Sequence, residues 1–175
     1  MNIIVRYIKP FPQKDRCVIL WRYNIWGGKI KVKKYTFMQR KEDVVREWHH
    51  YDAEGQILGR LAVEVAKKLM GKDKLTFTPH IDGGDFVVVT NVAKIMVTGN
   101  KLTDKTYYNH SGFPGGLRER KLGEILDKKP EELLMLAVKR MLPKNKLGRE
   151  QLTRLRVFAG AEHAHTAQKP VKVEF

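Results

Sequence analysis

The sequence predicts an α/β fold, in the form of a layered α/β/α domain with a small, mostly parallel sheet. Segments whose apolar residues repeat at helical spacing alternate with short apolar segments of strand length, which is the pattern of α/β layers. One short segment, 85–91, is a continuous apolar run, as expected for a strand buried on both faces of a parallel sheet. With 175 residues, 42% of them hydrophobic, the chain is long enough to build one core.

The first predicted elements are a strand and a helix. From Trp48 a short strand leads to a turn at Glu54 and Gly55. Over 57–70 the apolar residues fall on one helical stripe and the charged residues on the other face. Gly71 is well placed to end this helix. We therefore expect an amphipathic helix that packs against the sheet.

The middle of the chain predicts two strands and a helix. After the buried strand at 85–91, a second short strand is expected over 94–99, where Gly99 ends it. Residues 117–129 predict a helix. Its inward-facing residues are expected to be Leu122, Ile125 and Leu126.

Pro130 opens the next predicted helix, because a residue without an N–H costs nothing at the first helical position. Pro143 ends this helix, a tight turn follows over 144–146, and another helical turn begins at 147–149. A last strand is expected over 155–160, before a polar tail. The expected buried stripe of the Pro130 helix is Leu133, Leu134, Ala137, Val138 and Met141.

Basic residues dominate the composition, with 34 Lys and Arg against 19 Asp and Glu and a formal net charge of +15. Such an excess repels itself and is tolerated most easily beside a polyanion, so nucleic acid is the first expected partner and an anionic membrane surface the second. Cys17 is the only cysteine, so no internal disulfide can form, which fits a reducing compartment. No stretch approaches the ~18 apolar residues needed to span a bilayer, and we expect a cytosolic protein.

Residues 1–31 form a basic extension that differs in texture from the single domain expected over 32–175. One interpretation is an arm that folds on RNA. The other, which we favour, is a misplaced start. The codons for Trp26-Gly27-Gly28 can contain a purine run that binds a ribosome, and Val32 can be encoded by GUG, an alternative bacterial start codon.

The densest positive charge lies over 139–156, where a single acid, Glu150, accompanies seven cations. A solvated charged face is the alternative interpretation, but such a face normally mixes signs. Here the cations surround a helix end and a tight turn that contains Asn145, so the segment predicts phosphate binding. The cations are Lys139, Arg140, Lys144, Lys146, Arg149, Arg154 and Arg156.

The Gly/Pro-rich segment 109–117 places His110 beside Ser111. Neighbouring residues in an extended chain point opposite ways, so they rarely form a base and a nucleophile. No Walker loop is present, since no Gly-Lys-Ser or Gly-Lys-Thr follows the glycines. We expect a conformationally demanding loop that lets Gly112 and its neighbours approach RNA closely, with a purely structural turn as the alternative.

Two histidine-containing segments could suggest metal binding. In 80–85, His80, Asp82 and Asp85 lie close together, but no second ligand pair accompanies them, and turn chemistry is the favoured interpretation. His163 and His165 fit RNA contact and a plain surface loop about equally well. We expect no metal and no cofactor.

Several blocks of the chain, in order, resemble the bacterial-type family of large-subunit ribosomal proteins called L-thirteen. The resemblance runs from about Val32 to the carboxyl terminus. "YYNHSGFPGGL" and "MLPKNKLGR" are long and rare in composition, which makes a chance match implausible. The blocks are "DAEGQILGRLA" (52–62), "FTPHIDGGDFVVV" (77–89), "VTGNKL" (97–102), "YYNHSGFPGGL" (107–117), "MLPKNKLGR" (141–149) and "VFAGAEHAHTAQKP" (157–170).

The resemblance implies a structural constituent of the large subunit that binds 23S-type ribosomal RNA, joins early in assembly and has no catalytic residue or cofactor. It implies contacts with neighbouring large-subunit proteins. We expect a bacterial rather than an organellar ribosome, because the amino terminus does not read as a transit peptide. The chain departs from the family where Ala164 replaces the usual proline between two histidines, and at Val92-Ala93. The expected RNA contacts are Arg60, Lys101, His110, Ser111, Gly112, Arg118, Lys139, Arg140, Lys144, Asn145, Lys146, Arg149, Arg154, Arg156, His163 and His165.

Two rival functions fit the sequence less well. An RNA-modifying or nucleotide-using enzyme would need a glycine-rich phosphate loop after the first strand or an evident acid–base pair, and the sequence offers neither. A peripheral membrane protein would carry its cations on one face of an amphipathic helix, whereas here they cluster around turns. We therefore expect neither a small-molecule substrate nor a membrane partner.

Overall fold

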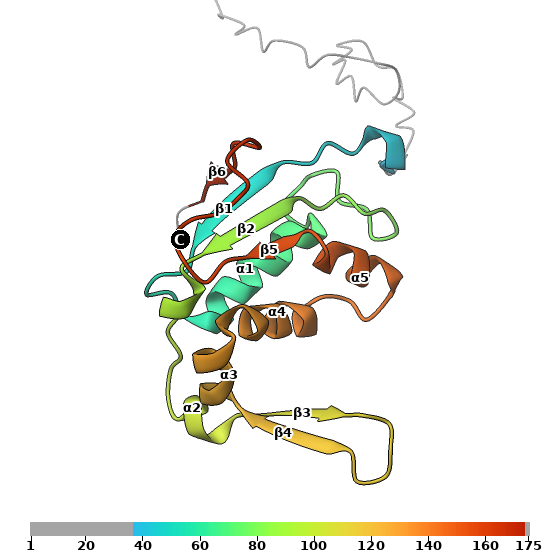
Figure 1. Cartoon of the computed structure of the whole chain (residues 1–175). Helices are drawn as coiled ribbons and strands as arrows, with labels where there is room; N and C mark the ends of the chain where they lie inside the picture. Colours follow the sequence, from blue (N-terminus) through green and yellow to red (C-terminus); the bar gives the residue numbers. More distant parts are fainter. Residues whose placement is uncertain (1–36, 174–175) are drawn as a thin grey trace, which may run out of the picture. The chain divides into compact units, whose positions relative to one another are not determined.

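A computed structural model describes residues 37–173 of the chain, so the predictions for 1–31 and for Val32 lie outside the described residues. A sheet of four parallel strands, in the order β5-β2-β1-β6, forms the centre (Figure 1). The α/β class and the mostly parallel sheet that the sequence predicts are confirmed. The strands are β1 (Trp48–Asp52), β2 (Phe86–Thr90), β5 (Leu155–Val157) and β6 (Val171–Lys172).

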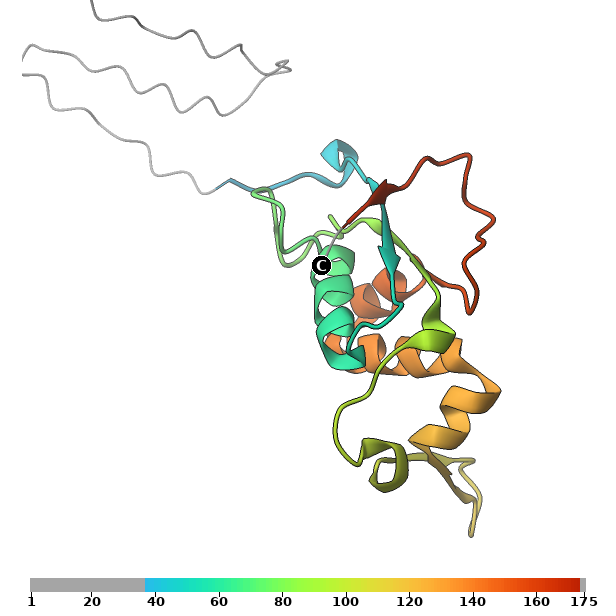
Figure 2. The same cartoon turned by 90° about the vertical axis from the view of Figure 1, so that its left-hand side faces the viewer.

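The longer helices all lie on one face of this sheet (Figures 1 and 2). From β1 to β2 to β5 the chain always moves in the same direction across the sheet. Because crossovers between parallel strands are right-handed, such steps place their helices on the same face. The helices are α1 (Leu58–Met70), α2 (Lys101–Asp104), α3 (Leu122–Lys128), α4 (Pro130–Met141) and α5 (Lys146–Leu152), and short 3-10 turns form η1 (Lys41–Asp43) and η2 (Val92–Lys94).

The second face of the sheet is covered by the segment 158–170 rather than by helices. The step from β5 to β6 runs in the opposite direction across the sheet, so a right-handed connection passes over the other face. His163 and His165 pack there, with ring centroids 5.2 Å from His50 and 5.3 Å from Trp48. In the described residues, the third layer of the domain is therefore this extended tail.

Helix α1 forms as the sequence predicts. Its apolar stripe is buried, and Gly71 ends it with φ 74° and its N–H bonded to the carbonyls of Lys67 and Lys68. A Cβ atom at Gly71 would lie 3.0 Å from the backbone of Gly83, so glycine is required both for the left-handed conformation and for space. The helix and the strands share one core.

Helix α4 also begins at Pro130 and ends before Pro143, as predicted. Leu133, Leu134 and Val138 are buried, but Met141, expected in the buried stripe, is 40% exposed. At the carboxyl end of α4, the apolar stripe is therefore not covered by other described residues.

Two predictions of secondary structure are wrong. Residues 94–99 form no strand, because η2 occupies their beginning and only Met96 makes a single bridge, to Ile57 at the start of α1. Residues 117–121 are not helical: they form β4 (Leu117–Lys121), which pairs antiparallel with β3 (Thr106–His110), and α3 begins only at Leu122. Every side chain of β4 is exposed, so pairing with β3 rather than burial decides its conformation.

Two smaller corrections concern the ends of predicted elements. The strand predicted over 155–160 ends at Val157, and it is not the last strand, because β6 follows in the tail. The segment 109–117, predicted as a loop, is loop only between the two strands of the hairpin.

Candidate nucleic-acid interface

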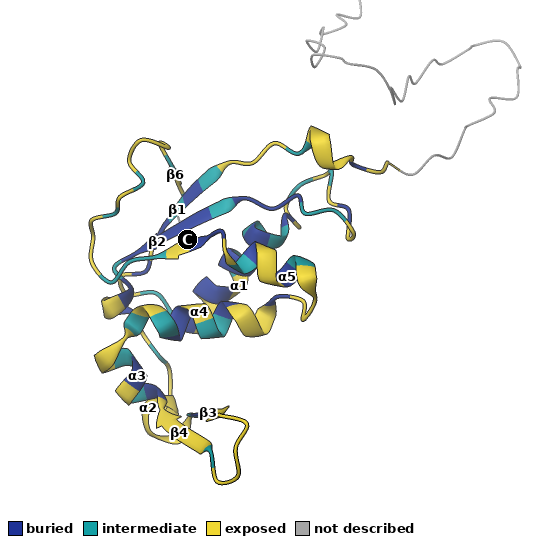
Figure 3. Ribbon diagram, turned by 45° about the vertical axis from the view of Figure 1, so that its right-hand side comes forward, coloured by how far each residue is buried: buried dark blue, intermediate teal, exposed yellow. Residues whose placement is uncertain are grey.

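The β3–β4 hairpin projects from the helical layer and is exposed along most of its length (Figures 1 and 3). Its strands pair from Thr106 with Lys121 to His110 with Leu117. The turn between them is conformationally demanding, as predicted, since Gly112 has φ 91° and Gly115 has φ 74°. His110, Ser111 and Gly112 therefore lie at the far end of an exposed two-stranded hairpin, with Arg118 beside them on β4.

Tyr107 fixes the base of this hairpin to helix α4. Its side chain is only 4% exposed, and the guanidinium carbon of Arg140 lies 4.6 Å from the centroid of its ring. The Nζ atom of Lys105 lies 5.5 Å from the same centroid. Cations held against an aromatic ring are attracted by its electron-rich face, so Arg140 is positioned before any partner arrives.

The turn between α4 and α5 holds its cations on a tightly constrained backbone. The side-chain oxygen of Asn145 accepts a hydrogen bond of 2.7 Å from the N–H of Gly148, which caps the start of α5. A Cβ atom at Gly148 would lie 1.9 Å from the carbonyl oxygen of Pro143, so only glycine fits there. Asn145, predicted as an RNA contact, thus has its side-chain oxygen occupied, while Lys144 and Lys146 beside it are exposed.

Two depressions flank the Tyr107–Arg140 contact, and both residues line each of them. The first depression brings Arg60 of α1 and Lys101 of α2 to the same place as Arg140. The second combines Lys139 and Lys144 with the hairpin strand β3. Residues from distant parts of the sequence that were predicted as RNA contacts therefore share one surface, which we call the cationic surface. Its cations are the six that line the depressions without an ion pair to another described residue, Arg60, Lys101, Lys105, Lys139, Arg140 and Lys144. We add Lys146 and Arg149, which are exposed on α5 shortly after Lys144 in the chain but line neither depression.

The cations of the cationic surface form no ion pairs with any residue that the structure describes, unlike the basic residues that pair with acids elsewhere in the domain. Within residues 37–173, none of the eight forms an ion pair. Elsewhere Lys94 pairs with Glu54 at 2.7 Å, and Arg120 with Glu132 at 2.9 Å. In the described part of the chain, no ion pair therefore neutralises these eight cations, which leaves them available to bind an external anion.

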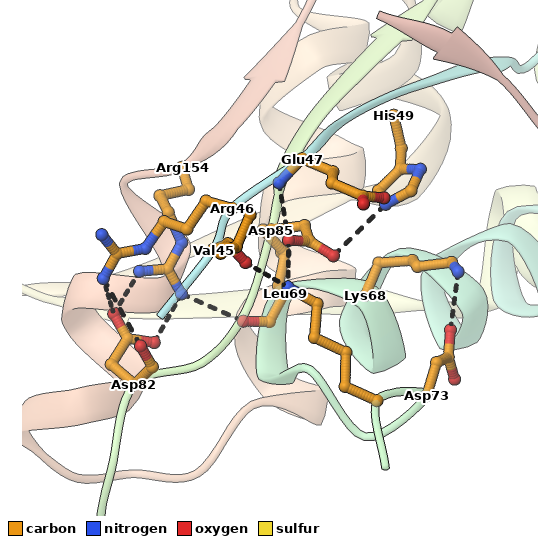
Figure 4. Close-up of polar contacts among 11 residues, drawn as sticks. Val45, Arg46, Glu47, His49, Lys68, Leu69, Asp73, Asp82, Asp85 and Arg154 are labelled. Atoms are coloured by element: carbon orange, nitrogen blue, oxygen red, sulfur yellow. Dashed lines mark hydrogen bonds and ion pairs between the residues drawn. The ribbon is translucent and has the colours of Figure 1, made fainter. Parts of the chain in front are cut away.

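Arg154 does not belong to this surface, although the sequence grouped it with the other cations. Its side chain is 8% exposed, pairs with the carboxylate of Asp82 and donates to the carbonyl oxygen of Leu69 at 3.1 Å (Figure 4). The guanidinium is thus used inside the domain and is not accessible to an external phosphate. These internal partners argue against the predicted contact of Arg154 with RNA.

Arg156 is exposed but lies on the other side of the sheet. It pairs in register with Val88 on β2, and these two positions alternate with core residues that face the helices. His163 and His165 also lie on that second face, where they pack against aromatic rings and line neither depression. The structure separates these three residues from the cationic surface.

The acidic residues Asp82 and Asp85 make long-range contacts within the domain rather than the local turn contacts that the favoured interpretation implies. Asp85 accepts a hydrogen bond of 2.9 Å from the N–H of Glu47, and it also contacts His49 at 3.3 Å and Lys74 (Figure 4). Burial raises the pKa of the Asp85 carboxyl, but the hydrogen bonds from His49, Lys74 and Glu47 outweigh it and lower the pKa below its usual value. No cluster of metal-binding side chains occurs within the described residues.

The sequence could not reveal these internal partners. Asp82 and Arg154 are 72 positions apart, so no local spacing indicates their pairing. Lys105, which reaches the Tyr107 ring and lines the first depression, was also missed, because it lies outside the basic block and the Gly/Pro-rich segment. None of the helices between residues 37 and 173 has the length and apolar character required to cross a membrane.

Comparison with known proteins gives a consistent family. The sequence model described as Ribosomal protein L13 matches residues 46–164. The protein named large ribosomal subunit protein uL13 of Maridesulfovibrio salexigens is 56% identical over 140 residues, which are 80% of this chain and 99% of that protein. The proteins of the same name from Brevibacillus brevis and Thermotoga petrophila are 57% and 54% identical, over 77% and 79% of this chain and 93% of each relative. The chain belongs to the ribosomal protein L13 family.

Proposed function

We propose that the chain is a structural constituent of the large ribosomal subunit that binds 23S-type ribosomal RNA through the cationic surface. The observation that carries this proposal is the set of unpaired cations around the Tyr107–Arg140 contact. The names of the relatives support the ribosomal part of the proposal, as a structural protein rather than an enzyme. Because these relatives are bacterial, the chain is a bacterial-type protein of the cytoplasmic ribosome.

The cationic surface is suited to folded RNA because its cations are held by rigid elements. Arg140 lies against Tyr107, and the turn that carries Lys144 and Lys146 is closed by the Asn145 cap. Phosphate contacts from a rigid scaffold set the position and orientation of a protein on the nucleic acid. The exposed hairpin, with its glycine-containing turn, adds a narrow projection that reads shape, which is how folded RNA is mostly recognised.

The test of a place in the large subunit is co-sedimentation. We expect the native protein to sediment with large subunits through a wash in high salt, because shape contacts between the exposed hairpin and folded RNA, unlike phosphate contacts, are not weakened by added counterions. Recovery of the protein in the supernatant, with other ribosomal proteins still bound to the subunit, would contradict the proposal.

We also propose that the chain joins early in assembly, together with other large-subunit proteins as later neighbours. An early protein must recognise RNA without help from the proteins that follow. We expect the purified full chain to bind protein-free 23S-type RNA, as measured by filter retention. If binding required prior addition of other large-subunit proteins, the early role would be excluded while the place in the subunit would stand.

A further inference from the structure

The first depression has a floor that the chain itself leaves uncovered. It has a volume of about 450 Å³ and lies between α1, α2, α4 and the base of the hairpin. Its apolar floor includes Val63 and Met141, which are 41% and 40% exposed. Met141 stands on the apolar stripe of α4 that the sequence predicts to be buried. Its exposure means that nothing among the described residues covers this end of the stripe.

The rim of the same depression is cationic and has no acid. Arg60, Lys101, Lys105 and Arg140 all line it, while neither Asp nor Glu does. None of these four cations forms an ion pair with another described residue. An occupant that satisfies both features must combine a flat apolar part for the floor with negative charge for the rim.

We propose that this depression binds one unstacked nucleotide of folded RNA, with the base on the floor and the flanking phosphates at the rim. The inference rests on the proposed function and names what part of the RNA this site recognises. Unpaired bases in RNA loops and bulges are recognised by stacking on side chains and on the planes of arginines. Arg140, which lines the depression and whose guanidinium carbon lies 4.6 Å from the centroid of the Tyr107 ring, can offer such a plane.

A neighbouring protein explains the depression less well. An apolar side chain from a protein would cover Val63 and Met141 but would leave the four rim cations unpaired. A nucleotide covers the floor and neutralises the rim at once. The second depression differs from the first, because its lining contains an acid, Glu132, which pairs with Arg120 at 2.9 Å.

The test compares two probes with the full-length chain. One is a single-stranded RNA of five adenosines, and the other is the same sugar–phosphate chain without bases. We expect the RNA with bases to bind roughly tenfold more tightly, because base stacking on a protein surface contributes about that factor per base. With methyl-labelled methionine, the Met141 signal should shift with the first probe and not with the second.

Two variants on the same helix make the result specific. Met141→Gln should remove most of the preference for the probe with bases, because a polar amide replaces part of the floor. Met135→Gln is the matched control, since Met135 is also 40% exposed on α4 but does not line the depression, and it should keep the preference.

The outcomes separate this inference from the proposed function. Equal binding of both probes, with the usual weakening by salt, would overturn the nucleotide site while RNA binding through phosphates would stand. Failure of both probes and of 23S-type RNA to bind would overturn both proposals. A shift of the Met141 signal by an acidic peptide of alternating glutamate and leucine, but not by the RNA probe, would show that the depression takes a protein.

Discussion

Two charged regions of the domain use the same residue types in opposite ways. Around Asp82 and Asp85, each carboxylate has a cationic partner, and the groups are largely buried (Figure 4). On the cationic surface, the cations are exposed and have no acidic partner among the described residues. Arg154 and Arg149 make the contrast sharpest, since they lie five positions apart in one basic block but belong to different regions.

The difference shows that the density of charge in a sequence does not by itself predict an interface. A buried cation must be paired, because an unpaired buried charge costs several kcal/mol, of order 3–5 when one partner of a buried pair is removed. An exposed cation needs no partner inside the protein. Pairing and burial, which only the fold reveals, therefore separate cations that stabilise the domain from those that can bind RNA.

The largest expected effect comes from breaking the buried pair. Arg154→Met leaves Asp82 and the carbonyl of Leu69 without their main partner, and we expect the free energy of unfolding to fall by about 3 kcal/mol. Arg46, whose Nη2 lies 3.7 Å from Asp82, limits the loss. Urea titration of the native chain and of Arg154→Met measures this fall in the free energy of unfolding.

Arg149→Ala is the matched control for that variant. Because Arg149 is exposed and unpaired, we expect its stability to change by less than about 0.5 kcal/mol, while its affinity for RNA falls. The reverse pattern, with Arg149→Ala destabilised and Arg154→Met defective only in RNA binding, would mean that the two regions have been assigned wrongly.

A smaller effect is expected at the turn that holds the cationic surface. Gly148→Ala places a Cβ atom 1.9 Å from the carbonyl oxygen of Pro143, so the backbone must shift. We expect a loss of about 1–3 kcal/mol in unfolding free energy, as for other overpacked sites. Thermal and urea unfolding both report it.

Gly59→Ala provides the comparison within a helix. No atom lies within 4 Å of a Cβ built at Gly59, so alanine should stabilise α1 by about 0.5–1 kcal/mol. Equal effects of the two alanines would show that the turn at Gly148 is less constrained than its contacts indicate.

The smallest expected effect is the loss of stability at low pH through protonation of Asp85. Folding lowers the pKa of Asp85. At pH values between the folded and the unfolded pKa, the unfolded chain therefore binds more protons than the folded chain. The stabilisation from Asp85 is thus complete above its unfolded pKa, near 4, and is lost as the pH falls toward its lower folded pKa. In urea titrations between pH 7 and pH 3, the stability difference between the native chain and Asp85→Asn should shrink with decreasing pH. A difference that grew toward low pH would reverse the assigned direction of the shift.

The parts of the fold that could be predicted from the sequence are those that burial decides. The stripe of α1, the opening of α4 at Pro130 and the apolar strand β2 all have local patterns that match their surroundings. Strand β4 has no such pattern, since its exposed residues, mostly charged, are compatible with either helix or strand, and only pairing with β3 selects the strand.

The candidate site could be predicted only in outline. The basic block indicated Lys144, Lys146 and Arg149, but a strand alternates its side chains, so Arg156 points to the other face of the sheet. Arg60 reaches the same surface only because α1 packs beside α4. The order of the parallel strands decides both results, and no local pattern in the sequence reveals that order.

The salt dependence of RNA binding tests the central claim most directly. In the triple variant Lys144→Ala, Lys146→Ala and Arg149→Ala, the log–log slope of affinity against salt should flatten by about 2 units, because the lost cations no longer displace counterions from phosphates. A control that removes the same charge from paired positions, with alanine at Lys67, Lys68 and Lys94, should leave the slope nearly unchanged. An unchanged slope in the first variant, or an equal change in both, would contradict the claim that unpaired cations form the RNA-binding surface.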